Sequence, residues 1–147
     1  MRYVALLALL VVAGRTQTAI GTWKLNRARS TFSGQTRPKT LVVRVEFHPK
    51  GEVVTVDQTE VNGQSTSAST VLYFDGVPRD FQGTGCSGSQ TARRLDGQTV
   101  EIIRQCAGGD WERLVHHLTQ QGKELLVEIT RQRSGRRVEQ RLVLEKE

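Results

Sequence analysis

The sequence predicts an all-β protein, an antiparallel up-and-down meander of about eight to ten strands closed into a barrel. Three observations point to this fold. Apolar and polar residues alternate along short segments, turn signals recur between those segments, and no helical period is sustained for long. The length of 147 residues suits one domain.

About ten segments carry the alternation, and short turns separate them. Asn62-Gly63, Asp75-Gly76 and Asp96-Gly97 are the clearest turn signals, because such pairs favour tight hairpins. Residues 26–32 allow one helical turn before a loop that ends at Pro38. The expected strands, in chain order, cover residues 20–25, 40–47, 52–61, 64–74, 77–82, 90–95, 98–106, 111–119, 124–132 and 137–145.

The apolar face of each strand follows from the two-residue period of side chains. We expect these faces to carry no acidic residue apart from Asp57 and Glu60, near strand ends. Two strands show the pattern well, with inward sets of Leu41, Val43, Val45 and Phe47 in one and Leu114, His116 and Leu118 in the other.

A meander of this length with one apolar face must roll up, because a flat sheet would leave exposed edges and one wet apolar side. An up-and-down barrel is the simplest closure. An outer-membrane barrel would turn its apolar residues outward. Arg and Glu at mid-strand on the second face, such as Arg44 and Glu46, disfavour that alternative.

The first nineteen residues resemble an export signal. Arg2 is followed by an apolar run over residues 3–13, which is as long as a signal-peptide core and too short to span a bilayer. Ala19 is a suitable residue before a cleavage site. We therefore expect residues 1–19 to be removed, leaving a barrel domain at 20–147 that is periplasmic or extracellular and has no stable membrane span. An uncleaved membrane anchor is the alternative.

The two cysteines, Cys86 and Cys106, are an even number for a chain expected in an oxidising compartment. If Asp96-Gly97 closes a two-residue hairpin turn, the two cysteines lie within one residue of direct opposition. A small bulge in the Gly-rich segment beside Cys86 would align them, so we predict a disulfide. Two free thiols are the alternative. A metal site formed by the two cysteines is disfavoured, because the sequence has no CxxC motif and no histidine near them to complete the ligand set.

The segment GTWKL at 21–25 resembles the opening strand of the calycins, the lipocalins and fatty-acid-binding proteins. The ending RLVLEKE is similar to the fatty-acid-binding branch, and GTWKLNRARSTF resembles a group of small secreted bacterial lipocalin-like proteins. Two features depart from the fatty-acid-binding pattern. The connection from Leu25 to Leu41 is too short for a two-helix lid, and Arg141-Leu142-Val143 replaces an Arg-x-Tyr carboxylate clamp.

This resemblance implies a carrier of a small hydrophobic or anionic amphipathic ligand, with Trp23 and Arg141 as a stacked pair that closes one end. From the strand faces, the ligand would contact Trp23, His116, Arg131 and Arg133. His116 could equally be a hydrogen-bonded core histidine, and the two arginines could be a solvated hairpin tip. A barrel filled by its own side chains, acting through its surface as an inhibitor or envelope interaction module, is the second functional hypothesis.

Composition excludes several other functions. The net charge of +6, from 21 basic and 15 acidic residues, suits an anionic partner. Aromatic residues do not interleave with the basic C-terminal stretch, which disfavours nucleic-acid binding. The sequence has no nucleophile elbow, phosphate-binding loop, dinucleotide fingerprint or paired carboxylates. We therefore expect no enzyme activity, no cofactor and no metal site.

Overall fold

The computed structural model describes residues 18–33, 37–83, 85–119 and 121–147. The predicted signal peptide therefore lies outside the described residues except for Thr18 and Ala19. The strands are β1 (Gly21–Leu25), β2 (Thr31–Phe32), β3 (Thr40–His48), β4 (Gly51–Thr59), β5 (Ser65–Tyr73), β6 (Arg79–Gly83), β7 (Cys86–Arg94), β8 (Thr99–Cys106), β9 (Trp111–Leu118), β10 (Glu124–Arg133) and β11 (Arg136–Lys146).

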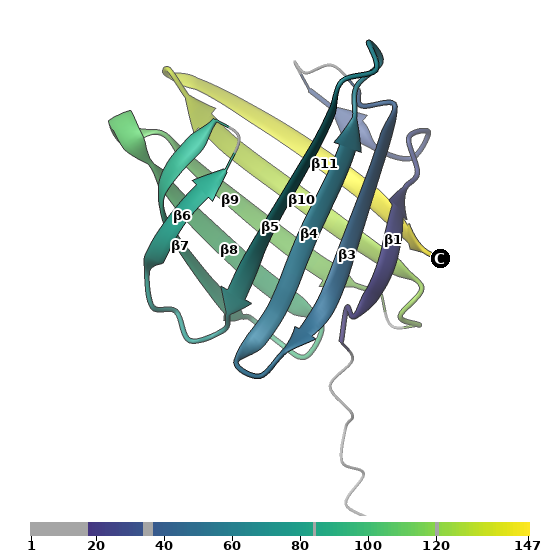
Figure 1. Cartoon of the computed structure of the whole chain (residues 1–147), viewed down its shortest axis with the longest axis horizontal. Helices are drawn as coiled ribbons and strands as arrows, with labels where there is room; N and C mark the ends of the chain where they lie inside the picture. The colour runs from purple at the N-terminus through teal and green to yellow at the C-terminus, as the bar shows by residue number, and fades with distance from the viewer. Residues whose placement is uncertain (1–17, 34–36, 84, 120) are drawn as a thin grey trace, which may run out of the picture.

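These strands form one antiparallel sheet that curls into a barrel (Figure 1). Their order is β5-β4-β3-β1-β11-β10-β9-β8-β7-β6, and β2 pairs with β11 beside this path. The first and last long strands pair, with Trp23 opposite Lys146, and this pairing joins the two halves of the meander. The predicted all-β barrel is confirmed. Residues 26–32 form a turn and the short strand β2 rather than a helical turn.

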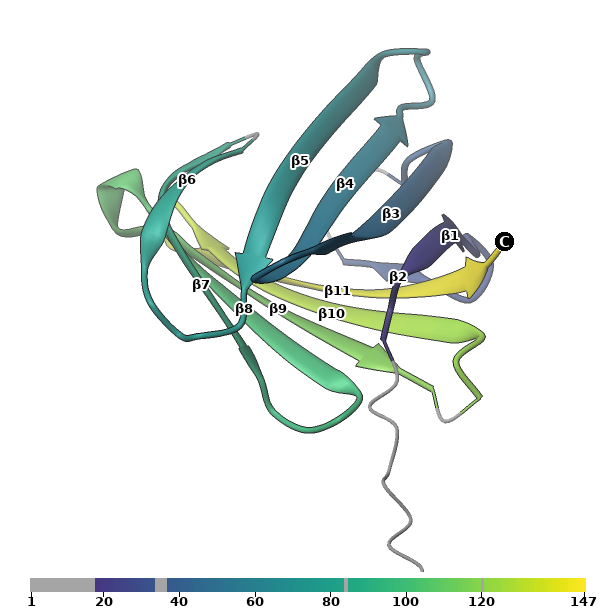
Figure 2. The same ribbon diagram turned by 60° about the horizontal axis from the view of Figure 1, so that its bottom comes forward.

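One seam of the barrel stays open. Within the described residues no strand pairing joins β5 to β6, and Figure 2 shows the two strands diverging. A side-chain hydrogen bond crosses behind the seam instead, from Gln90 Nε2 on β7 to Thr70 Oγ1 on β5 at 3.0 Å. On this side of the barrel a side-chain hydrogen bond, not a backbone ladder, links the strands.

The core follows the predicted alternation. Leu41, Val43 and Val45 of β3 are buried, as expected. Phe47 is the exception, because its side chain is 74 % exposed one residue from the end of β3. The strand extends beyond the packed interior at this point. A side chain on the inward side of a strand is therefore not buried unless other residues pack against it. The buried cluster consists of Trp23, Leu41, Val43, Val45, Val54, Leu72, Ala92, Val100, Ile102, Leu114, Leu118, Leu125, Val127, Ile129, Leu142 and Leu144.

Trp23 belongs to the buried core of the barrel. Its side chain is fully buried, and its indole Nε1 donates a hydrogen bond to the Ala19 carbonyl oxygen at 2.7 Å. The cation beside the ring is Lys146, whose Nζ lies 5.7 Å from the ring centroid. The predicted Trp23–Arg141 pair is wrong, because the strand register places Lys146 opposite Trp23 and leaves Arg141 exposed opposite Thr31.

The structure contains the predicted disulfide between Cys86 and Cys106, with their Cα atoms 4.9 Å apart. The predicted bulge is absent. The β7–β8 ladder runs unbroken from Gly88–Cys106 to Arg94–Val100, so the cysteines are offset diagonally by two residues. The backbones of β7 and β8 approach closely at Gly88, where a side chain would not fit, since a Cβ there would lie 1.9 Å from the Gln105 carbonyl oxygen.

Candidate ligand-binding site

The barrel encloses a cavity of about 410 Å³. Its wall is mostly apolar, and the aliphatic side chains come from strands on both sides of the barrel. Trp23 lies outside this wall, so its predicted ligand contact does not occur within the described structure. The apolar lining includes Leu41, Val43, Val54, Val56, Leu72, Ile102, Leu114, Leu125, Val127, Ile129, Leu142 and Leu144.

A row of four polar side chains crosses this apolar wall. Gln90, Arg104, Glu112 and Arg131 lie directly opposite one another on β7, β8, β9 and β10. Residues in direct register point to the same face of a sheet. All four therefore face the barrel interior, and the two arginines and Glu112 line the cavity.

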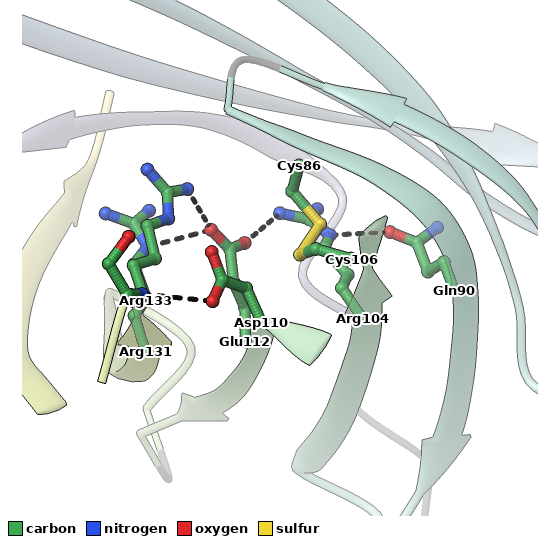
Figure 3. Close-up of a disulfide and its surroundings, with 9 residues drawn as sticks. Cys86, Gln90, Arg104, Cys106, Asp110, Glu112, Arg131 and Arg133 are labelled. Carbon is green, nitrogen blue, oxygen red and sulfur yellow. Dashed lines mark hydrogen bonds and ion pairs between the residues drawn. A yellow bond between two sulfur atoms is a disulfide. The ribbon is translucent and has the colours of Figure 1, made fainter. Parts of the chain in front are cut away.

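Glu112 is the centre of this row. Arg104 Nη1 lies 3.2 Å from its Oε2, and Arg131 Nε lies 3.1 Å from its Oε1. Arg133, two residues further along β10, places Nη2 at 2.5 Å from the same Oε1 (Figure 3). Three guanidinium groups therefore surround one carboxylate, and we call these four residues the arginine cluster.

Further contacts fix the arginines of the cluster. Arg104 Nε donates to Gln90 Oε1 at 2.9 Å, and its guanidinium lies 4.2 Å from the Phe81 ring centroid. Arg133 packs against Gly85, where a Cβ would lie 2.8 Å from its Nη1. Gly85 has φ of +74°, so the turn between β6 and β7 favours glycine for its backbone as well as for this contact.

The charges of the arginine cluster do not balance. Three arginines and one carboxylate leave a net charge of +2. Burial acts to raise the pKa of Glu112, but Arg131, Arg133 and Arg104 together hold that pKa below its ordinary value, so Glu112 is ionised. The buried Nε of Arg133 makes no hydrogen bond among the described residues, and the buried Nε of Arg131 has only its ion-pair contact with Glu112 Oε1. An anion at this position would supply the missing charge and hydrogen-bond acceptors.

His116 lies deeper in the same cavity, four residues from Glu112 along β9. Burial and then the charge of Arg104 lower its pKa to about 4, so the imidazole is neutral at physiological pH. Its ring also borders a small pocket of about 20 Å³ at the end of the barrel near Ala19. That pocket also borders Glu52, a buried carboxylate whose oxygen lies 3.4 Å from Arg94 Nη2.

The structure brings three of the predicted ligand contacts, His116, Arg131 and Arg133, to one cavity. Arg104 and Glu112 were not predicted as site residues, and the expectation that the apolar faces lack other acidic residues is wrong at Glu112 and at Glu52, which are both buried. The signal was present, because Glu112 shares parity with Leu114, and Arg104 shares parity with Ile102.

No protein-family model and no curated protein matches this sequence. Among solved structures, the chain is similar to zebrafish ileal bile acid-binding protein in complex with cholic acid. The TM-score is 0.57 at 12% identity, over 88% of this chain and 100% of that chain.

It is also similar to a Schistosoma mansoni fatty acid binding protein in complex with arachidonic acid, with a TM-score of 0.54 at 10% identity, over 91% of this chain and 99% of the other. No helix in the described part of the chain is long and apolar enough to cross a membrane. At these identities the likeness establishes the fold alone, which is a calycin-type barrel.

Proposed function

We propose that this chain is a carrier that binds a small amphipathic anion, with the hydrocarbon part inside the barrel and the acidic head on the arginine cluster. The observation that carries the proposal is the excess of two positive charges around Glu112, in the wall of a mostly apolar cavity of about 410 Å³. Binding of this kind requires no reaction, so we propose a transport or sensing role and no enzyme activity.

The arginine side chains of the cluster are already ordered before a ligand carboxylate binds beside Glu112. Their guanidinium groups are already held by Glu112, Gln90 and Phe81, so little side-chain freedom is lost when an anion binds. Apolar wall residues would bury the rest of the ligand. The bile acid and the fatty acid named with the two similar structures are amphipathic anions of this class.

We further propose that the carrier is exported, that residues 1–19 are a removed signal and that residues 20–147 form the mature barrel. The apolar leader sequence and the Cys86–Cys106 disulfide support export. The opening segment GTWKLNRARSTF supports a relation to small secreted bacterial lipocalin-like proteins. The alternative of a filled barrel acting through its surface is disfavoured, because its interior would lack a cavity of this size.

The test is a titration of the delipidated protein with decanoate, followed by calorimetry. Wild type should bind, and Arg131→Met should weaken binding about tenfold or more, because a hydrogen bond to a charged group contributes about 1.5–3 kcal/mol. Arg136→Met is the matched control, since Arg136 is exposed on the same hairpin. Its affinity should equal that of wild type. Equal weakening by both substitutions would mean that general surface charge, not the arginine cluster, attracts the anion.

A further inference from the structure

We propose that the ligand has polar groups at both ends, an anionic head on the arginine cluster and a neutral hydroxyl or carbonyl group that hydrogen-bonds to His116. This inference rests on the proposed function, because the arginine cluster defines where the first end of the ligand lies. It adds a recognition element that a simple fatty-acid carrier does not need.

The His116 ring is a half-buried polar group in the cavity wall that has no protein partner for its nitrogens. Within the residues that the structure describes, its nitrogens make no hydrogen bond or ion pair, and the ring lines the cavity. The adjacent His117 differs, because its Nδ1 shares a hydrogen bond with Thr99 Oγ1 at 2.9 Å. A ligand pocket usually combines a mostly apolar wall with a few polar groups that fix the ligand, and the unpartnered His116 ring is such a group in this cavity.

The nearest neighbours of His116 within the sheet are apolar. Val100 and Val127 lie directly opposite it on β8 and β10, and Leu114 and Leu118 flank it on the same face of β9. No side chain in this set offers the ring a hydrogen bond. On the cavity side, a polar ligand atom beside His116 would therefore meet the ring among these aliphatic neighbours, while Glu52 and Arg94 border the small pocket on its other side.

The charge state of His116 limits the chemistry of its partner. A neutral imidazole has one N–H donor and one acceptor nitrogen. It does not attract an anion, so a second carboxylate is disfavoured at this end of the ligand. A hydroxyl group satisfies either nitrogen, and a carbonyl oxygen accepts from the N–H.

The strand geometry sets the distance between the two ends. Glu112 and His116 are separated by four residues of a continuous strand, which is about 13 Å between their Cα atoms. An extended hydrocarbon chain with ordinary bond lengths and angles advances about 1.25 Å per carbon. The two polar groups of the ligand should therefore be separated by about ten carbons.

The experiment compares decanoate, 10-hydroxydecanoate and 2-hydroxydecanoate by calorimetry on the full mature protein. We expect wild type to bind 10-hydroxydecanoate about three- to tenfold more tightly than decanoate, the range for one net hydrogen bond. The 2-hydroxy acid should gain nothing from His116, because its hydroxyl lies beside the head group. In His116→Leu the order should reverse, since a terminal hydroxyl would then be buried against leucine without a partner.

Two further variants control the result. His117→Leu makes the same substitution one residue along the strand, where the side chain is exposed, and should keep the wild-type preference. His116→Gln retains a hydrogen-bond donor and an acceptor, so this variant should keep part of the preference for 10-hydroxydecanoate over decanoate. Binding of decanoate that depends on Arg131, together with no preference for the 10-hydroxy acid, would overturn this inference and leave the proposed function standing. Failure of wild type to bind any of the three acids would overturn both.

Discussion

Glu112 is the single residue on which the head-group site depends. Its side chain is almost completely buried and is shared by Arg104, Arg131 and Arg133. Without it, three positive charges would face one another in a partly apolar chamber. The negative charge of Glu112 therefore stabilises the barrel when no ligand is bound. Because this charge neutralises only one of the three arginines, two positive charges can attract an anionic ligand.

We predict that Glu112→Gln lowers the free energy of unfolding by about 3 kcal/mol, because removing one partner of a buried ion pair leaves uncompensated charge. Chemical denaturation at pH 7 measures this. Glu139→Gln is the control, since Glu139 is exposed on β11 and pairs with Arg137 at the surface, and it should change stability by less than about 0.5 kcal/mol. Equal stability of the Glu112 variant and wild type would show that solvent in the cavity already screens the cluster.

At the scale of elements, the disulfide joins the start of β7 to the end of β8. Arg104 lies two residues before Cys106, and Cys86 itself lines the cavity, so the bond holds the strand ends beside the arginine cluster (Figure 3). The open seam beside β6 makes this bond more important, because β6 pairs only with β7 among the described strands.

We predict that the double substitution Cys86→Ser and Cys106→Ser lowers the free energy of unfolding by about 3 kcal/mol, the value for a closed loop of about 20 residues. Denaturation with and without dithiothreitol measures the loss. The reductant should destabilise wild type to the level of the double variant and leave the variant unchanged. If dithiothreitol has no effect on wild type, the cysteines are not bonded in the protein.

At the scale of the whole molecule, the two ends of the barrel hold buried carboxylates with opposite pH behaviour. Arginines hold the pKa of Glu112 below its ordinary value. Burial raises the pKa of Glu52, and Arg94 offsets only part of that effect. The folded state therefore favours ionised Glu112 at one end and protonated Glu52 at the other.

The sign of the Glu52 effect follows from linkage. A carboxyl group whose pKa is raised by folding contributes stability below its unfolded pKa, and that contribution is lost as pH rises through the folded pKa. We predict that Glu52→Gln is more stable than wild type at pH 7.5, and that the difference shrinks as pH falls toward the ordinary pKa of 4.5. Chemical denaturation of both proteins at several pH values measures this difference in the free energy of unfolding. A variant less stable than wild type throughout would show that the Glu52–Arg94 pair stabilises the fold.

Much of the fold was predictable because its signals are local. Alternation placed Leu41, Val43 and Val45 in the core, and Asn62-Gly63 marked a hairpin turn. The disulfide was predictable from the approximate hairpin geometry. Its diagonal offset was not, because the loop after Leu95 contains three residues rather than two, and Leu95 N donates to the Thr99 carbonyl across it.

The sequence by itself determined the antiparallel barrel, the inward direction of His116, Arg131 and Arg133, and the pairing of the two cysteines. Two-residue periodicity and turn chemistry act over a few residues, so one strand at a time is enough to detect them. Only the tertiary structure decided that Lys146 rather than Arg141 lies beside Trp23, and that Arg104, Glu112, Arg131 and Arg133 meet. Those contacts depend on the register between separate strands, where a shift of one residue would turn a side chain from the cavity to solvent.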